Sequence, residues 1–224
     1  MRMLAVFEKS ERIRHIGHLD IQRSVQRGLR RSNLPVAYSN GFNPHILITF
    51  ASALSTGACG LREIMDVTMA KDVTEEEFLE RMNRAMPPEL HLLEARAVDD
   101  RHPALMGTLR AACYDLKIHD ADQAAKVIAA IPAMMERETI MAMRKTKTAL
   151  KETDIKPLIF ALKGEGSHIY ATLALTEREA CKPGMLMEAL SREAGVDQEI
   201  RTLVIRKELL GKDEEGKLVP LEQL

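Results

Sequence analysis

Three histidines in the first fifty residues have the most potential for chemistry. His15 and His18 stand in the run Arg14–Asp20 (RHIGHLD), and His45 ends a turn-rich loop further along. Imidazole gains or loses a proton near neutral pH, so these three side chains are candidates for general acid and base catalysis. A His-x-x-His pair with one acid is a short and common pattern, and we expect no metal site here.

A helix predicted from Gly17 to Asn33 carries a basic surface. Ile21, Val25 and Leu29 recur at four-residue spacing and form its apolar face. The opposite face carries arginines without an acid four residues away to pair them, namely Arg23, Arg27, Arg30 and Arg31. A solvated face would also fit this pattern, but unpaired arginines suit bidentate recognition of phosphate.

Asp20 stands in the first turn of that helix. A negatively charged side chain at this place is stabilised by the positive N-terminal end of the helix dipole. We therefore expect Asp20 to cap the helix or to orient His18.

The loop from Tyr38 to His45 (YSNGFNPH) combines turn-forming residues with aromatic and amide side chains. Gly41 permits a positive φ, which can turn backbone N–H groups toward a ligand. Tyr38, Asn43 and His45 are equipped to stack on and read an unpaired base. We expect Phe42 to pin the loop to the core.

A second basic strip lies between Arg144 and Lys156. On a predicted strand, Lys145 and Lys147 would point to the same face. Exposed lysines also protect strand edges from aggregation, so the strip supports a nucleic-acid contact only weakly.

Charge is distributed unevenly along the 224 residues. The first fifty contain eight Lys/Arg and three acids, a net charge of +5, and the remaining chain carries −6 because the whole chain has −1. A basic segment on an otherwise acidic chain concentrates positive potential and favours an anionic partner.

Hydrophobic periodicity predicts an α+β fold of two tandem ferredoxin-like domains. Strands and helices follow in the order β-α-β-β-α-β, and the order recurs with one added strand. The strands are predicted at Met3–Lys9, His45–Ala51, Glu63–Ala70, Leu90–Val98, Ala112–Ile118, Thr139–Thr146, Ile155–Leu162, His168–Leu175 and Arg201–Lys207. After the first helix, the others are predicted at 75–86, with Thr74 as N-cap, at Ala121–Ile131 and at Lys182–Ala194. The domains span 1–99 and 108–210, and 211–224 is predicted to be a charged, loosely held tail.

The sequence also bears on where the protein is located and on which cofactors it could bind. Cys59, Cys113 and Cys181 are isolated, and we expect a cytoplasmic protein without a signal peptide or membrane span. Phosphate-binding loops, dinucleotide-binding loops, serine-nucleophile elbows and iron–sulfur motifs are absent. We therefore expect no cofactor of its own, and a companion subunit rather than an independent enzyme.

The N-terminal motifs resemble those of the radical SAM-linked protein family. The resemblance rests on Arg14–Asp20, on Leu34–His45 (LPVAYSNGFNPH) and on Ala53–Gly57 (ALSTG) followed by Glu63 and Asp66. A later run, 154–159 (DIKPLI), resembles the second-half motif of the family. Glu63 and Asp66 are expected to have structural or orienting roles.

This resemblance implies a companion to a cobalamin-binding radical SAM protein. That partner would carry an iron–sulfur cluster, S-adenosylmethionine and cobalamin. We therefore expect an RNA-binding accessory protein in tRNA or rRNA modification. One alternative is an endoribonuclease using His15, His18 or His45. The other is a protein–protein adaptor whose basic helix docks on the radical SAM protein.

Overall fold

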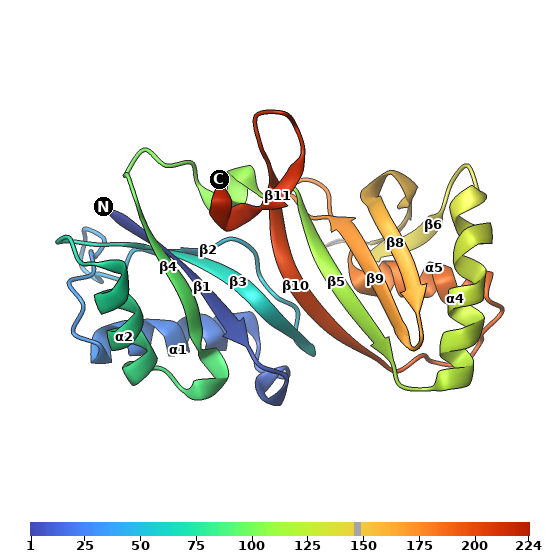
Figure 1. Ribbon diagram of the computed structural model, residues 1–224, viewed down its shortest axis with the longest axis horizontal. Coiled ribbons are helices and arrows are strands. Elements are labelled where there is room, and N and C mark those ends of the chain that lie inside the picture. The colour runs from blue at the N-terminus through green and yellow to red at the C-terminus, as the bar shows by residue number, and fades with distance from the viewer. Residues whose placement is uncertain (146–148) are drawn as a thin grey trace. The chain divides into compact units, whose positions relative to one another are not determined.

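A computed structural model describes residues 1–145 and 149–224, and it shows a mixed α+β protein (Figure 1). The sheet is mostly antiparallel, and the described residues form five α-helices. The α+β class predicted from the sequence is confirmed. The chain divides into unit 1, Met1–Leu109 with Glu208–Leu224, and unit 2, Arg110–Lys207. No helix in the described ranges is long and apolar enough to span a membrane.

Unit 1 places two long helices against an antiparallel sheet. Its elements are β1 (Arg2–Lys9), α1 (His18–Arg31), β2 (Ile48–Phe50), β3 (Ala58–Thr68), α2 (Glu75–Ala85), β4 (Leu92–Val98), α3 (Leu105–Thr108) and β11 (Leu218–Pro220), with 3-10 turns at Glu11–Ile13, Pro88–Leu90 and Leu221–Gln223. The strand order is β4-β1-β3-β2, and neighbouring strands are antiparallel. Compared with the prediction, β2 is shorter and β3 begins earlier.

One apolar core joins both helices to the same face of this sheet. The predicted apolar face of α1 is buried, and it shares the core with Phe78 and Met82 of α2. The strands contribute alternate residues to this core: Met3, Ala5, Phe7, Met65 and Val67. Alternate residues of a strand point to the same side of the sheet. The helices α1 and α2 therefore cover one face of this sheet and not the other (Figure 1).

The two helices begin differently. At α2 the backbone N–H of Glu77 donates to Thr74 Oγ1 at 3.1 Å, which confirms Thr74 as the N-cap. At α1 the N-cap is Gly17, which has no side chain to accept a hydrogen bond. Of the two roles expected for Asp20, capping the helix is therefore wrong. Its carboxylate accepts a hydrogen bond from Arg23 Nη1 at 2.9 Å instead.

The last residues of the chain return to unit 1. Where a loosely held tail is predicted, β11 pairs with the end of β10, and Leu221 is buried. Arg62 pairs with Glu222 at 2.7 Å, and Arg96 donates to the carbonyl oxygens of Glu222 and Leu224. Apolar burial and two arginines thus fix this charged segment.

Unit 2 contains a second antiparallel sheet and two helices. Its elements are β5 (Ala111–Ile118), α4 (Ala121–Glu136), β6 (Met141–Lys145), β7 (Leu150–Asp154), β8 (Ile159–Glu165), β9 (His168–Ala174), α5 (Pro183–Glu193) and the first part of β10 (Thr202–Lys212), with a 3-10 turn at Lys156–Leu158. The strand order is β10-β5-β9-β8, and β6 pairs with β7 in a separate hairpin.

Two features of unit 2 differ from the sequence prediction. The helix α4 continues past Pro132 to Glu136, because buried Met134 keeps its last turn packed. The strand β7 (LKETD) is not among the predicted strands, since it is mostly exposed and lacks an apolar alternation. It is defined by its pairing with β6 and by Asp154, whose carboxylate accepts hydrogen bonds from the backbone of Ile140 and Lys156.

Candidate nucleic-acid interface

The basic residues of the first fifty differ in how available their charges are. Lys9 is 2% exposed, and its ammonium donates to three backbone carbonyls at 2.9 to 3.0 Å. The acids Asp66, Glu89, Glu11 and Asp20 pair with Arg2, Arg12, Arg14 and Arg23 respectively. The excess of positive charge that the sequence predicts is therefore largely neutralised or buried.

Arg27 and Arg30 remain available on α1. Both side chains are exposed, and neither has a hydrogen bond or an ion pair with any other described residue. They stand three residues apart, so they share the outer face of the helix. Arg23 lies on the same face but is paired with Asp20, because an acid three residues away is also within reach. The predicted stripe of four free arginines is reduced to two.

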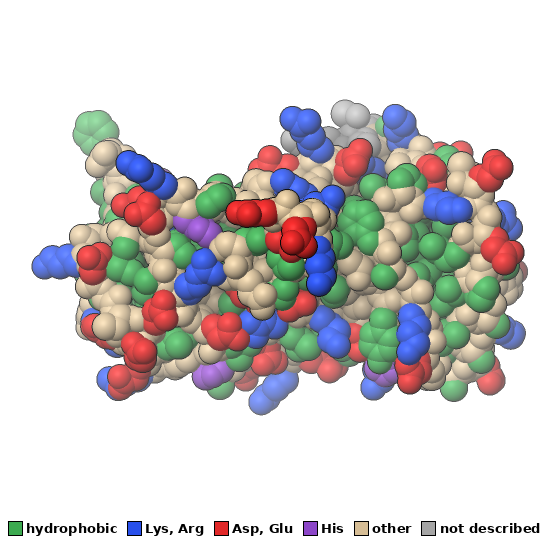
Figure 2. All heavy atoms as spheres, turned by 45° about the horizontal axis from the view of Figure 1, so that its top comes forward, with side chains coloured by type: hydrophobic (Ala, Val, Ile, Leu, Met, Phe, Trp, Pro, Cys, Tyr) green, Lys and Arg blue, Asp and Glu red, His purple; other side chains and the backbone are tan. Residues whose placement is uncertain are grey.

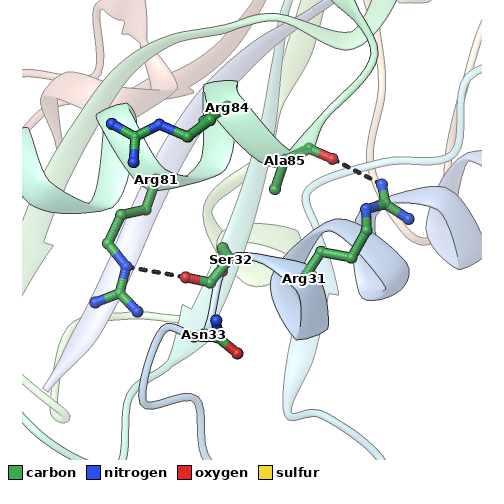
Figure 3. A pocket seen from close by; sticks show the side chains of 6 residues that line it. All are labelled: Arg31, Ser32, Asn33, Arg81, Arg84 and Ala85. Carbon is green, nitrogen blue, oxygen red and sulfur yellow. Dashed lines mark hydrogen bonds between the residues drawn. The ribbon is translucent and has the colours of Figure 1, made fainter.

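Arg31 takes part in helix–helix packing. Its Nη2 donates to the carbonyl of Ala85 at the end of α2, at 2.7 Å, and Arg81 of α2 donates to the carbonyl of Ser32 after α1, at 2.9 Å (Figure 3). Together with Asn33 and Arg84 these residues line a hollow of about 520 Å³. Both guanidinium groups thus donate to carbonyls at helix C-terminal ends, and Arg31 is in part engaged within the fold.

His18 lies in a small hollow beneath α1. Its ring contacts Phe50 edge to face, with ring centres 5.3 Å apart. Buried Lys9 and buried Glu63 line the same hollow. His15 lies on the exposed turn before α1. The ionisable side chains beside His18, Lys9 and Glu63, are thus buried within the fold.

The loop between Tyr38 and His45 extends from unit 1. His45 fixes its base: the ring Nδ1 lies 2.8 Å from Ser39 Oγ, and the His45 backbone N–H donates to the same oxygen at 3.1 Å. Gly41 has φ +125°, in the region that glycine favours. Phe42 is fully exposed and Tyr38 is 46% exposed. The expectation that Phe42 pins the loop to the core is wrong, and Asn43 is exposed beside it.

His45 also borders a hollow of about 450 Å³ on unit 1. Arg2 and Asp66 are among its lining residues, and Arg2 Nε donates to both carboxylate oxygens of Asp66 at 3.0 and 3.2 Å. The hydrogen bond to Asp66 raises the pKa of Arg2 above its ordinary value. His102 also lines the hollow, and its backbone carbonyl accepts a hydrogen bond from Arg2. Burial, assisted by positive Arg2 and Arg96, lowers the pKa of His102.

His18 and His45 face opposite sides of the sheet. Glu63, beside His18, alternates with Met65 on the side that α1 covers. Asp66, beside His45, is one residue out of phase and points to the other side. The fold therefore places His45, His102 and Asp66 around one hollow. His18 lines a different hollow.

The second basic strip falls on the hairpin β6–β7. Arg144 lies directly opposite Lys151 in the register, so two like charges face each other. Lys145 is the last residue of β6, and Lys147 lies outside the described residues. Lys156 donates to the carbonyl of Arg137 and is thereby tied to the end of α4.

A protein-family model matches residues 2–183, which include nearly all of the first 109 residues and most of unit 2. Its description is an uncharacterised protein conserved in bacteria, DUF2344. The chain belongs to the DUF2344 family. No curated protein matches the chain. The DUF2344 match includes the loop at Phe42, the arginine helix and the strands β8 and β9.

One residue of the candidate site in this DUF2344 protein, His102, is not predicted from the sequence. His102 stands in an irregular connection, and only the folded chain brings it to His45. Figure 2 shows Lys and Arg side chains interspersed with Asp and Glu over the face in view, so no large field of one sign covers it. Within the described ranges, no three His, Cys, Asp or Glu residues are grouped as metal ligands.

Proposed function

We propose that this chain is an RNA-binding accessory protein that acts with a radical SAM partner in tRNA or rRNA modification. The observation that carries the proposal is the loop with fully exposed Phe42 and exposed Tyr38. Exposed aromatic rings are costly to leave in water, and stacking on an unpaired base removes them from it. Arg27 and Arg30, free on α1 among the described residues, supply positive charge for the phosphates.

The hollow that His45 lines is suited to the ribose–phosphate part of a nucleotide. His45 and His102 offer ring nitrogens, and Thr49 and Thr68 offer hydroxyl groups. Two hydrogen bonds to Asp66 position the Arg2 guanidinium beside this hollow. The radical SAM partner rests on the resemblance of the N-terminal motifs alone.

Binding of fluorescently labelled bulk tRNA, measured at several salt concentrations, tests the proposal. Replacing both Arg27 and Arg30 with Ala should weaken binding and lower the salt slope by about two, one for each lost phosphate contact. Replacing Arg12 and Arg84 with Ala is the matched control, because both are exposed and already paired with glutamates. Equal losses in the two double variants, or no salt-dependent binding by the wild type, would contradict the proposal.

A second candidate is an RNA-cleaving enzyme, and the pairing of His45 with His102 in one hollow favours it. The lowered pKa of His102 favours its neutral ring, the form that can accept a proton. Labelled structured RNA incubated with the protein between about pH 5 and 9 tests this reading. RNA that stays intact throughout excludes it.

We also propose that both units are ferredoxin-like. The orders β4-β1-β3-β2 and β10-β5-β9-β8 are the same when strands are numbered within each unit, with β6–β7 as an inserted hairpin in unit 2. Two helices accompany each set of strands, as the βαββαβ pattern requires. Amide contacts between β5 and β10, measured by NMR, test the assignment for unit 2, because antiparallel pairing of these strands is required.

A further inference from the structure

The sheet of unit 2 has one face that its helices leave uncovered. Gly164 of β8 lies directly against Ile128 of α4, so the helix layer is on the side of Gly164. Ile169, the partner of Gly164 on β9, is buried on that side. Residues one position away point to the opposite face. Lys163 and Tyr170 therefore lie on the face away from α4.

The register of the strands arranges this second face in rows. Residues opposite each other in an antiparallel sheet share a face, so each row crosses β5, β9 and β8. The rows are Lys117, His168 and Glu165; Asp115, Tyr170 and Lys163; and Cys113, Thr172 and Ala161. Tyr170 is at the centre, on an inner strand, and 36% of its side chain is exposed.

Tyr170 is part of an ordered aromatic surface. The ring of His168 lies almost parallel to the Tyr170 ring, at 13°, with centres 6.0 Å apart. Asp115 fixes the orientation of His168, since its Oδ1 lies 2.8 Å from Nδ1 of that ring. Nδ1 is thereby engaged, and Nε2 is left to meet a ligand. Two aligned rings on an open sheet form a surface for stacking a nucleobase.

Cations surround these rings. The ammonium of Lys207 on β10 lies 5.9 Å from the centre of the Tyr170 ring. Lys117 is exposed and has no ion pair with any residue that the structure describes. The nearby acids are already used: Asp115 contacts His168, and Glu165 pairs with Lys163 at 2.7 Å. Lys117 and Lys207 therefore remain for phosphate groups.

We infer that this face, centred on Tyr170, binds single-stranded RNA by stacking a base on Tyr170 and His168. Lys117 and Lys207 contact the adjoining phosphates. This inference rests on the proposed function, and it assigns unit 2 a second RNA surface that contacts unpaired nucleotides. Charge complementarity and an aromatic pair on inner-strand positions favour RNA over a protein, because a protein would more readily add to an edge strand.

Binding of a short fluorescein-labelled oligouridine to the full chain tests this. Tyr170→Leu should weaken binding about tenfold, within the range for one lost stacking contact. Tyr170→Phe, which keeps the ring, should restore most of the affinity. Phe160→Leu is the matched control: Phe160 is an exposed aromatic on β8, outside the rows described, and its loss should change affinity less than about twofold.

Alkylation of Cys113 supplies a direct readout. Its Sγ lies 3.6 Å from Thr172 Oγ1, next to Tyr170 on the same face. Bound oligouridine should slow the reaction of Cys113 in the wild type and in Tyr170→Phe, but not in Tyr170→Leu. Protection that grows with protein concentration in the absence of RNA would assign the face to a second copy of the chain and overturn the inference.

The two proposals fail in different ways. If the wild type binds RNA with a salt slope that depends on Arg27 and Arg30, but Tyr170→Leu binds oligouridine normally, only the surface on unit 2 is wrong. If the wild type binds no RNA, both proposals are wrong.

Discussion

Arg31 and Arg81 cap each other's helices: each donates a hydrogen bond to a backbone carbonyl at the C-terminal end of the helix that carries the other. Such carbonyls lack partners within their own helix and carry partial negative charge. The two contacts thus join the ends of α1 and α2 through complementary charge (Figure 3). Arg31, an arginine that the sequence predicts to bind phosphate, thus also has a structural contact.

Arg31→Ala should consequently destabilise unit 1, by about 1 kcal/mol. Arg27→Ala, one turn earlier on the same helix and without a described partner, should change stability by less than about 0.5 kcal/mol. Urea denaturation followed by circular dichroism measures both. Equal stability of the two variants would show that the contact between Arg31 and Ala85 contributes nothing.

Lys9→Met should be much more costly. The substitution keeps the length of the side chain but leaves the carbonyls of Arg14, Ile16 and Ala58 without their donor. We expect a loss of about 3 kcal/mol. Lys71→Met, at an exposed position, is the control and should be nearly neutral. If the Lys9→Met variant had the same melting temperature as the wild type, water would replace the ammonium as hydrogen-bond donor without loss of stability.

His102 should make the stability of the protein depend on pH. Its pKa is lowered in the fold by burial and by Arg2 and Arg96, so the unfolded chain binds a proton more readily. The stabilisation from neutral His102 is complete above the unfolded pKa, about 6.5, and is lost as pH falls toward the folded pKa. His102→Asn should flatten the dependence of the denaturation midpoint between about pH 7 and 5. An unchanged slope would refute this.

The three thiols should differ in reactivity. Burial raises the pKa of Cys181 to about 12 and also raises that of Cys59. The thiolate is the reactive form, so both should be slow toward iodoacetamide at about pH 8. Cys113 is only partly buried and should be modified first. Mass spectrometry of the digested protein locates the label, and all three should react in urea. Early labelling of Cys181 would contradict the expected order.

Phe42→Ser should lower RNA affinity and leave the melting temperature unchanged. The ring is fully exposed, so its removal gives up no packing in the folded chain. Loss of one stacking contact predicts a decrease of about fivefold or more. Leu61→Ser, a change at an exposed apolar residue on β3, is the control. A lower melting temperature for Phe42→Ser would instead indicate that the loop packs in solution.

Periodicity predicts most of the secondary structure, and it fails where local signals are weak. The spacing of Ile21, Val25 and Leu29 identifies α1 because burial of one face imposes that spacing. The strand β7 is mostly polar, and no pattern in one strand reveals a partner that it pairs with. The predicted helix end at Ile131 is too early, since Pro132 lies inside α4.

The candidate site is harder to predict than the fold, because ion pairing depends on distance in space. Arg2 and Lys9 count as positive charge in the sequence. In the fold, Arg2 pairs with Asp66, and Lys9 donates to three backbone carbonyls. No motif singles out Tyr170, since its surroundings depend on register with β5 and on Lys207, far along the chain. The loop at Tyr38 is recognisable because its residues are consecutive.

The return of Glu208–Leu224 to unit 1 makes unit 2 an insertion within another folding unit. During synthesis, Arg110–Lys207 leaves the ribosome as one continuous stretch. Unit 1 is complete only after β11 and Leu221 have also been synthesised. The apolar surface of unit 1 that Leu221 covers is thus exposed until Leu221 itself has been synthesised. A chain that ends before Glu208 would contain all of unit 2 but only part of unit 1, so we expect proteases to cleave such a chain first in unit 1.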